Sequence, residues 1–167
     1  NKYLLSHGGH AQAAGLSLEH NKFDDLYNHL LELAENTISE DALERKLKIE
    51  ATADIADLNI EIAHEVMKFS PFGHANNKPI IALSNLILKD YKTVGKENTH
   101  LKFLVSDLKG NFLKCISFNG AERFLKIINS SSTLSFNGYD VAGELEIDSW
   151  NGSESLSFKV VDLRRSE

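Results

Sequence analysis

The sequence has 167 residues, 42% of them hydrophobic, which suffices for one medium domain or two small ones with modest cores. No window approaches the roughly 18–20 consecutive apolar residues of a membrane span, and the N-terminal residues lack the apolar core of a signal peptide. We therefore expect a cytoplasmic protein with no membrane partner. The formal net charge of −6 argues against a strongly basic DNA-binding protein.

Charge is distributed unevenly along the chain. Residues 19–65 carry thirteen acids and four bases, whereas residues 86–126 carry eight bases and four acids. A basic segment within an acidic chain is a candidate phosphate-contacting surface, although charge runs are often only solvated faces. The chain starts at Asn1 rather than at a methionine, so we expect a fragment of a longer protein.

The first seventy residues predict a small mixed region. His7–Gly15 predicts a glycine loop that opens a short helix at AQAA, followed by a short strand containing Leu16 and Leu18. An amphipathic helix is expected over residues 21–38, with Asn21 as its N-cap.

Two more elements are expected before the chain changes character. Residues 46–51 predict a strand with Leu47, Ile49 and Ala51 facing inward, and residues 60–68 predict a helix capped by Asn59. Pro71 and Gly73 should end that helix. We place a domain junction near this loop, giving domains of residues 1–70 and 71–167.

The second domain is rich in predicted strands. Strands are expected over residues 80–91, 100–106, 112–118, 139–148 and 156–162, with a tight turn around Gly110 and a short helix over residues 121–128. This order fits a five-stranded OB barrel, whose helix lies between strands three and four. An SH3-like barrel or a split sandwich fits the order of elements as well. The predicted fold class is therefore α+β.

The glycine motif is the first candidate site. Gly8 and Gly9 permit a close approach of the main chain to a ligand, and free N–H groups at a helix start suit a phosphate. His10 adds a titratable donor nearby. A simple tight turn explains the glycines equally well. A zinc pair of His7 and His10 is disfavoured, because zinc takes three or four ligands.

The second candidate is the surface of the barrel, since OB folds bind oligonucleotides on the face of strands two and three. The alternation over residues 100–106 places Leu101, Phe103 and Val105 in the core. Basic residues on the outer face would follow phosphates, and exposed aromatic rings would stack on bases. The candidate residues on and beside this face are Tyr91, Lys92, Lys96, His100, Lys102, Lys114 and Trp150.

The pattern over residues 112–118 contains a conflict, because Phe112, Ile116 and Phe118 share the parity of Lys114. We expect Phe103, Phe118 and Phe158 to lie in the core. Trp150 is either an exposed stacking residue or a buried residue beside the final turn. Cys115, the single cysteine, permits no intrachain disulfide, and we expect its thiol to be buried and inert.

Familiar nucleophile and nucleotide motifs, such as G-x-S-x-G, a P-loop, C-x-x-C and H-E-x-x-H, are absent from the sequence. Four segments instead resemble, in order, parts of the RecJ family of single-stranded-DNA-specific exonucleases within the DHH phosphoesterase superfamily. These segments are SHGGHAQAAGLSL, SPFGHANNKPI, VGKENTHLKF and ELEIDSWNGSESLSFKVVDLR. Ala75 departs from the glycine that the family generally has in the second segment.

The resemblance implies the end of a DHH-associated domain followed by an OB domain. It implies a 5′→3′ exonuclease that uses Mg²⁺ or Mn²⁺, held by Asp and His residues of a DHH domain with no counterpart in this sequence. Gly8, Gly9 and His10 would hold the substrate phosphate, and the chain by itself should be inactive and bind no metal. Single-stranded DNA is the expected partner, with single-strand-binding protein or other repair proteins as further partners.

Two other functions fit part of the sequence. An OB module that docks partner proteins in a repair complex would explain the acidic first half. A different DHH phosphodiesterase, acting on short RNA or cyclic dinucleotides, would share the glycine motif. The barrel after Pro79 argues against this last interpretation, because such small substrates need no track for a single strand.

Overall fold

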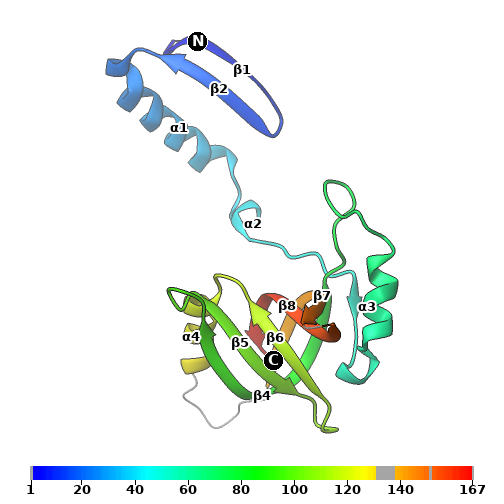
Figure 1. Cartoon of the computed structure of the whole chain (residues 1–167). Helices are drawn as coiled ribbons and strands as arrows, with labels where there is room; N and C mark the ends of the chain where they lie inside the picture. Colours follow the sequence, from blue (N-terminus) through cyan, green and yellow to red (C-terminus); the bar gives the residue numbers. More distant parts are fainter. Residues whose placement is uncertain (1, 131–137, 151, 167) are drawn as a thin grey trace. The chain divides into compact units, whose positions relative to one another are not determined.

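The computed structural model describes residues 2–130, 138–150 and 152–166. The chain forms two compact units, Asn1–Leu47 and Lys48–Glu167 (Figure 1). The division expected from the sequence lay later, near residue 70. The segment between these two positions belongs to the second unit because its strand pairs with the barrel and its helix packs on it.

The first unit opens with a β-hairpin. Strands β1 (Leu4–His10) and β2 (Ala13–Leu18) pair in antiparallel fashion, with Gly8 opposite Gly15. The predicted helix at AQAA is therefore wrong. A Cβ atom on Gly9 would lie 2.6 Å from the carbonyl oxygen of Ala13, so this glycine lets the two strands approach closely.

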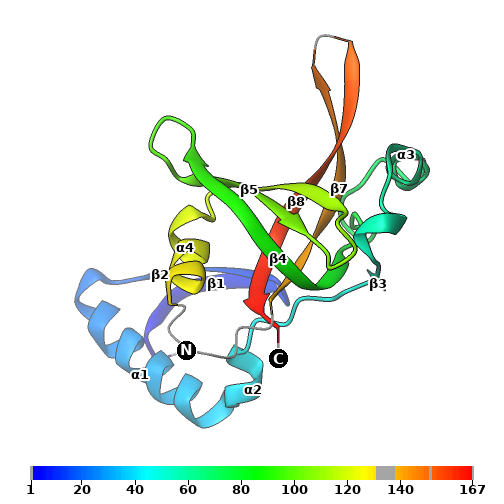
Figure 2. The same ribbon diagram turned by 90° about the horizontal axis from the view of Figure 1, so that it is seen from below.

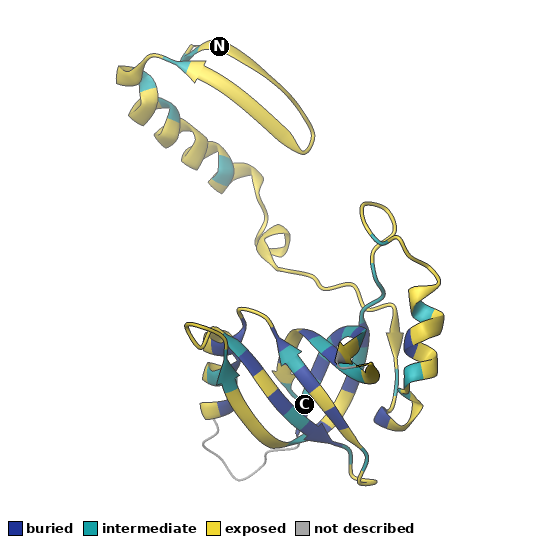
Figure 3. Cartoon of the chain, in the orientation of Figure 1, coloured by how far each residue is buried: buried dark blue, intermediate teal, exposed yellow. Residues whose placement is uncertain are grey.

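A 3₁₀ turn (His20–Lys22) and helices α1 (Phe23–Thr37) and α2 (Glu40–Leu43) complete this unit. The predicted helix is confirmed, but its predicted cap is wrong. Lys22 holds the N-cap position, without a side-chain capping bond, and Asn21 lies in the 3₁₀ turn. None of the described residues of this unit is buried, and the apolar side of α1, including Tyr27 and Leu33, is exposed (Figure 3).

The second unit begins with a short strand and a helix. Strand β3 (Ala51–Thr52) pairs in parallel with the start of the barrel, while Leu47 and Ile49 are exposed. The longer inward-facing strand predicted over residues 46–51 is thus wrong. Helix α3 (Ile60–Met67) is confirmed with its cap: the Oδ1 atom of Asn59 accepts a hydrogen bond from the Ile62 N–H at 2.8 Å.

Five strands and one helix form the barrel. They are β4 (Ile81–Val94), β5 (His100–Ser106), β6 (Phe112–Ser117), α4 (Ala121–Asn129), β7 (Tyr139–Trp150) and β8 (Ser153–Arg165). The strand order is β4-β5-β6-β8-β7, and an additional β4–β7 pairing closes the ring. Strands β6 and β8 pair in parallel, and α4 lies between β6 and β7 in the sequence. This strand order, with α4 between the third and fourth barrel strands, confirms the predicted OB-type α+β fold.

The barrel core follows the period-two alternation of the strands. Leu101, Phe103 and Val105 of β5 are buried, as predicted, and Phe158 of β8 is fully buried. Helix α4 contributes Phe124 to the same core. Beyond the barrel, β7 and β8 continue as a long hairpin (Figure 2). The outward faces of β5 and β6, which carry Lys102 and Lys114, are exposed.

The turn between β5 and β6 forms as predicted. Gly110 adopts a positive φ of 89°, and the Asp107 carboxylate accepts hydrogen bonds from the N–H groups of Lys109 and Asn111. The Asn111 side-chain amide donates a further hydrogen bond to this carboxylate at 2.7 Å. That bond, together with the backbone bonds, holds the pKa of Asp107 below its usual value. In the described part of the chain, no helix is long and apolar enough to cross a membrane.

Gly143 of β7 is a steric requirement of the closed barrel. Its strand pairs with β4 and β8 at this point, and an added Cβ atom would meet the Lys159 carbonyl oxygen and approach Phe158 Cε1 to 2.8 Å. We expect Gly143→Ala to lower the free energy of unfolding by about 1–3 kcal/mol, the usual cost of overpacking. Urea denaturation measures this change. Gly73→Ala is the control, since nothing lies within 4 Å of its Cβ position, and equal stability of the two variants would contradict the prediction.

Candidate nucleic-acid interface

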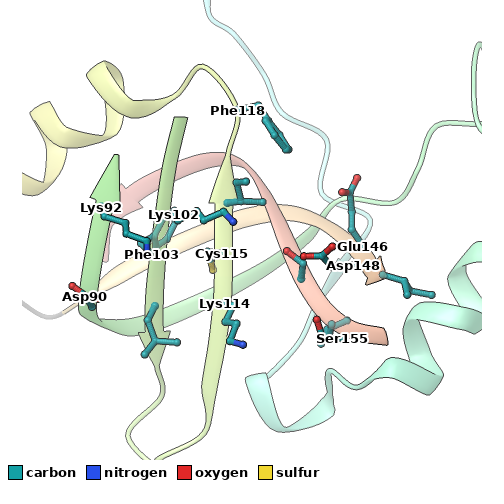
Figure 4. Close-up of a pocket in the computed structure, with 15 residues that line it drawn as sticks. Asp90, Lys92, Lys102, Phe103, Lys114, Cys115, Phe118, Glu146, Asp148 and Ser155 are labelled. Carbon is teal, nitrogen blue, oxygen red and sulfur yellow. The ribbon is translucent and has the colours of Figure 1, made fainter. Parts of the chain in front are cut away.

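A groove of about 570 Å³ lies on the outer face of the barrel (Figure 4). Strands β4, β5, β6, β7 and β8 all contribute to it. Its lining residues are Asp90, Lys92, Lys102, Phe103, Leu104, Lys114, Cys115, Ile116, Phe118, Glu146, Ile147, Asp148, Ser155, Leu156 and Ser157. The groove combines apolar side chains, such as Leu104, Ile116 and Leu156, with charged groups. Its volume lies within the range of about 300–1,000 Å³ that is typical of ligand sites.

Three lysines from consecutive strands form what we call the lysine wall: Lys92 of β4, Lys102 of β5 and Lys114 of β6. The strand register places Lys92 directly opposite Lys102, and Lys114 opposite Leu104. All three side chains are exposed, and none forms an ion pair with another described residue. Like charges on neighbouring strands that lack close ion-pair partners favour a local positive potential.

The other side of the groove has a different chemistry. Glu146 and Asp148 of β7 lie opposite Ser157 and Ser155 of β8 in the strand register. We call these residues the carboxylate wall. Lys78 and Lys159 lie 3.5 and 3.8 Å from Glu146 and partly neutralise it. Asp90 of β4 is an acid on the same side as the lysine wall.

Phe118 is a functional candidate that the sequence prediction placed wrongly. Its side chain is 51% exposed and lines the groove, although it was expected in the core. The sequence contained a signal for this position, because Phe118 shares the alternation of Lys114 over residues 112–118. Leu113 and Cys115 fill the core positions, so Phe118 faces outward with Lys114, just beyond the end of β6.

His100 supports Phe118 from the neighbouring strand. The two rings meet edge to face, with centroids 5.3 Å apart. The Nδ1 atom of His100 accepts a hydrogen bond from the Asn119 N–H at 3.0 Å, which fixes the imidazole beside the turn that carries Phe118. The Nε2 atom of a neutral ring then carries the proton. The pair offers one aromatic surface at the end of the lysine wall.

The remaining predicted barrel residues do not join the groove. Tyr91 is exposed, but it lies opposite Phe103 in the register and therefore on the other face of the sheet from Lys92. Lys96 is exposed in the β4–β5 loop, away from the groove lining. The side chain of Trp150 lies outside the described residues.

The glycine motif belongs to the other unit. Gly8, Gly9 and His10 are exposed on β1, and the Nδ1 atom of His10 accepts a hydrogen bond from the Gln12 N–H at 3.3 Å. Because the segment is a strand, a phosphate site at a helix N-terminus is not formed here. Across the described ranges, no group of three or more His, Cys, Asp or Glu side chains could hold a metal ion.

The comparisons with known proteins agree with this fold. A family model described as the RecJ OB domain matches residues 49–162, and the chain therefore belongs to this family. The single-stranded-DNA-specific exonuclease RecJ of Bacillus subtilis is 30% identical over 98% of this chain and 20% of its own length. RecJ of Haemophilus influenzae is 27% identical over 94% of this chain and 26% of its own length.

A solved structure supports the same fold. The crystal structure of RecJ in complex with Mn²⁺ from Thermus thermophilus covers 99% of this chain and 22% of that chain, with a TM-score of 0.68 and 22% sequence identity. The chain spans about a fifth to a quarter of the length of the curated relatives it matches.

Cys115 lies beneath the groove with its side chain in the core. It is 3% exposed, and burial raises the pKa of its thiol above the ordinary value. We expect the native protein to resist a thiol reagent such as dithionitrobenzoate at pH 8, and the protein in guanidinium chloride to release one equivalent of chromophore for its one cysteine. Rapid stoichiometric labelling of the native protein would contradict this burial.

Proposed function

We propose that this chain is the C-terminal substrate-binding portion of a RecJ-like 5′→3′ single-stranded-DNA exonuclease that acts in DNA repair and recombination in the cytoplasm. The groove on the barrel holds the single strand and guides it toward a metal site in a DHH domain. Membership in the RecJ OB family supports the enzyme class. The groove supports the role within it.

The observation that carries the proposal is the pairing of Lys92 with Lys102. Like charges directly opposite each other on adjacent strands are destabilising, and neither lysine forms an ion pair with another described residue. Lys114 extends the same positive surface to the next strand. A phosphate backbone lying across these strands neutralises the lysines and releases the counterions condensed on the DNA.

Phe118 supplies the second element of single-strand binding. A base stacked on an exposed aromatic ring gains about 1–3 kcal/mol, with little dependence on sequence. His100 contacts this ring edge to face. Lysines along the phosphates and an aromatic ring under the bases are the combination that non-specific single-strand binding requires.

In this proposal the residues of this chain do not perform the hydrolysis, which takes place in a DHH domain. Mg²⁺ or Mn²⁺ bound in a DHH domain would activate the attacking water and stabilise charge on the phosphate. The described residues of this chain bind and orient the strand, and we propose that the chain by itself is inactive. The hairpin exposes Gly8, Gly9 and His10. Nothing lies within 4 Å of the position of a Cβ atom on Gly8, and this open surface suits contact with the substrate phosphate.

The lysine wall should determine the salt dependence of binding. We expect the triple variant Lys92→Ala, Lys102→Ala, Lys114→Ala to bind a fluorescent oligo-dT weakly, with the slope of log affinity against log salt reduced in magnitude by about 2, since each phosphate contact on a single strand contributes about 0.7. Fluorescence anisotropy across a salt series measures both quantities.

The matched control is Lys48→Ala, Lys68→Ala, Lys126→Ala, which removes the same charge from exposed positions outside the groove. The control should keep the wild-type slope. Equal behaviour of the two triple variants would overturn the groove as the DNA site and favour a protein-docking role for the barrel.

Phe118 should contribute to affinity without contributing to salt dependence. We expect Phe118→Ala to weaken oligo-dT binding by about 5–100-fold with an unchanged salt slope, because stacking releases no ions. Phe112→Ala is the control at the opposite end of β6, since Phe112 is 59% exposed but does not line the groove. Similar losses in both variants would show that Phe118 is not a specific stacking residue.

A further inference from the structure

The groove has two chemically different sides, and only one of them suits phosphate. The lysine wall is cationic, whereas the carboxylate wall presents Glu146, Asp148 and the hydroxyl group of Ser155 (Figure 4). Ser157 also lines this side of the groove. The β7–β8 register keeps these four side chains in two neighbouring pairs. A strand that lies in the groove therefore meets opposite charges across its width.

This asymmetry would orient a single strand bound in the groove. Phosphates are attracted to Lys92, Lys102 and Lys114 and repelled by the carboxylates, so the backbone follows the lysine wall. The base attached to each sugar would then extend across the apolar side chains of the groove, with its hydrogen-bonding edge at the carboxylate wall.

The carboxylates differ in how strongly they can act on a base. Glu146 shares its charge with Lys78 and Lys159, at 3.5 and 3.8 Å. Asp148, near the hairpin tip, makes no ion pair with another described residue, and its side chain is exposed. An ionised carboxylate only accepts hydrogen bonds, so Asp148 is the stronger acceptor for a base.

We propose that the carboxylate wall gives this groove a base preference, in which Asp148 and Glu146 accept hydrogen bonds from exocyclic amino groups and disfavour bases that present a carbonyl there. This inference rests on the proposed single-strand-binding role of the groove. Cytosine carries an N4 amino donor, which Asp and Glu side chains accept. Uracil and thymine carry the O4 acceptor at the same position, which faces the carboxylate lone pairs unfavourably.

Oligo-dC and oligo-dU of equal length test this preference, because their bases differ at the 4-position and neither carries a methyl group. At pH 7.5 and fixed salt, we expect the whole chain to bind oligo-dC at least about fivefold more tightly than oligo-dU, the lower end of discrimination by a good base contact. In the double variant Glu146→Gln, Asp148→Asn, the ratio should fall to about one, because an amide both donates and accepts.

The ratio of the two affinities removes the general effect of deleting negative charge, which strengthens binding to any nucleic acid. The control variant Glu97→Gln, Glu122→Gln makes the same charge change outside the groove lining and should keep the wild-type ratio. Equal binding of both oligonucleotides by the wild type would overturn the base preference and leave the single-strand site intact. A ratio that persists in Glu146→Gln, Asp148→Asn would also overturn it. Failure to bind either oligonucleotide would instead overturn the proposed function.

Discussion

The double pairing of β4 is the constraint on which the barrel depends. The first half of this strand pairs with β7 and the second half with β5, so one strand closes the ring. Register shifts at Leu83/Leu86 and Leu88/Asp90 bend β4 between its two partners, with Asn85 at a positive φ of 57°. Closure removes the open sheet edges and fixes which side chains enter the core.

The groove is a consequence of this closure. Because Leu101 and Phe103 face the core, Lys102 between them faces outward. The register of β4 and β5 then places Lys92 beside Lys102. The same alternation on β6 turns Lys114 and Phe118 toward the same side. Placing two lysines opposite each other lowers the stability of the sheet, but the apolar side chains beneath them stabilise the fold. The exposed positive charge is then available to a polyanion.

The sequence predicted those parts in which alternation was strong. The barrel strands, helix α4, and α3 with its Asn59 cap follow from local pattern and capping chemistry. The hairpin was mistaken for a helix because AQAA has high helix propensity, which strand pairing overrides. Phe118 was assigned to the core because aromatic residues are usually buried, and Tyr91 could not be placed on a face before the β-bulge in β4 was known.

The proposed function places single-stranded DNA on the outer face of β4, β5 and β6. Titration of the isotope-labelled 167-residue chain with unlabelled oligo-dT, followed by amide chemical shifts in NMR spectra, tests it most directly. We expect the largest shifts on groove residues such as Lys102, Lys114 and Phe118. Shifts confined to α3, or to the face that carries Tyr91, would contradict it.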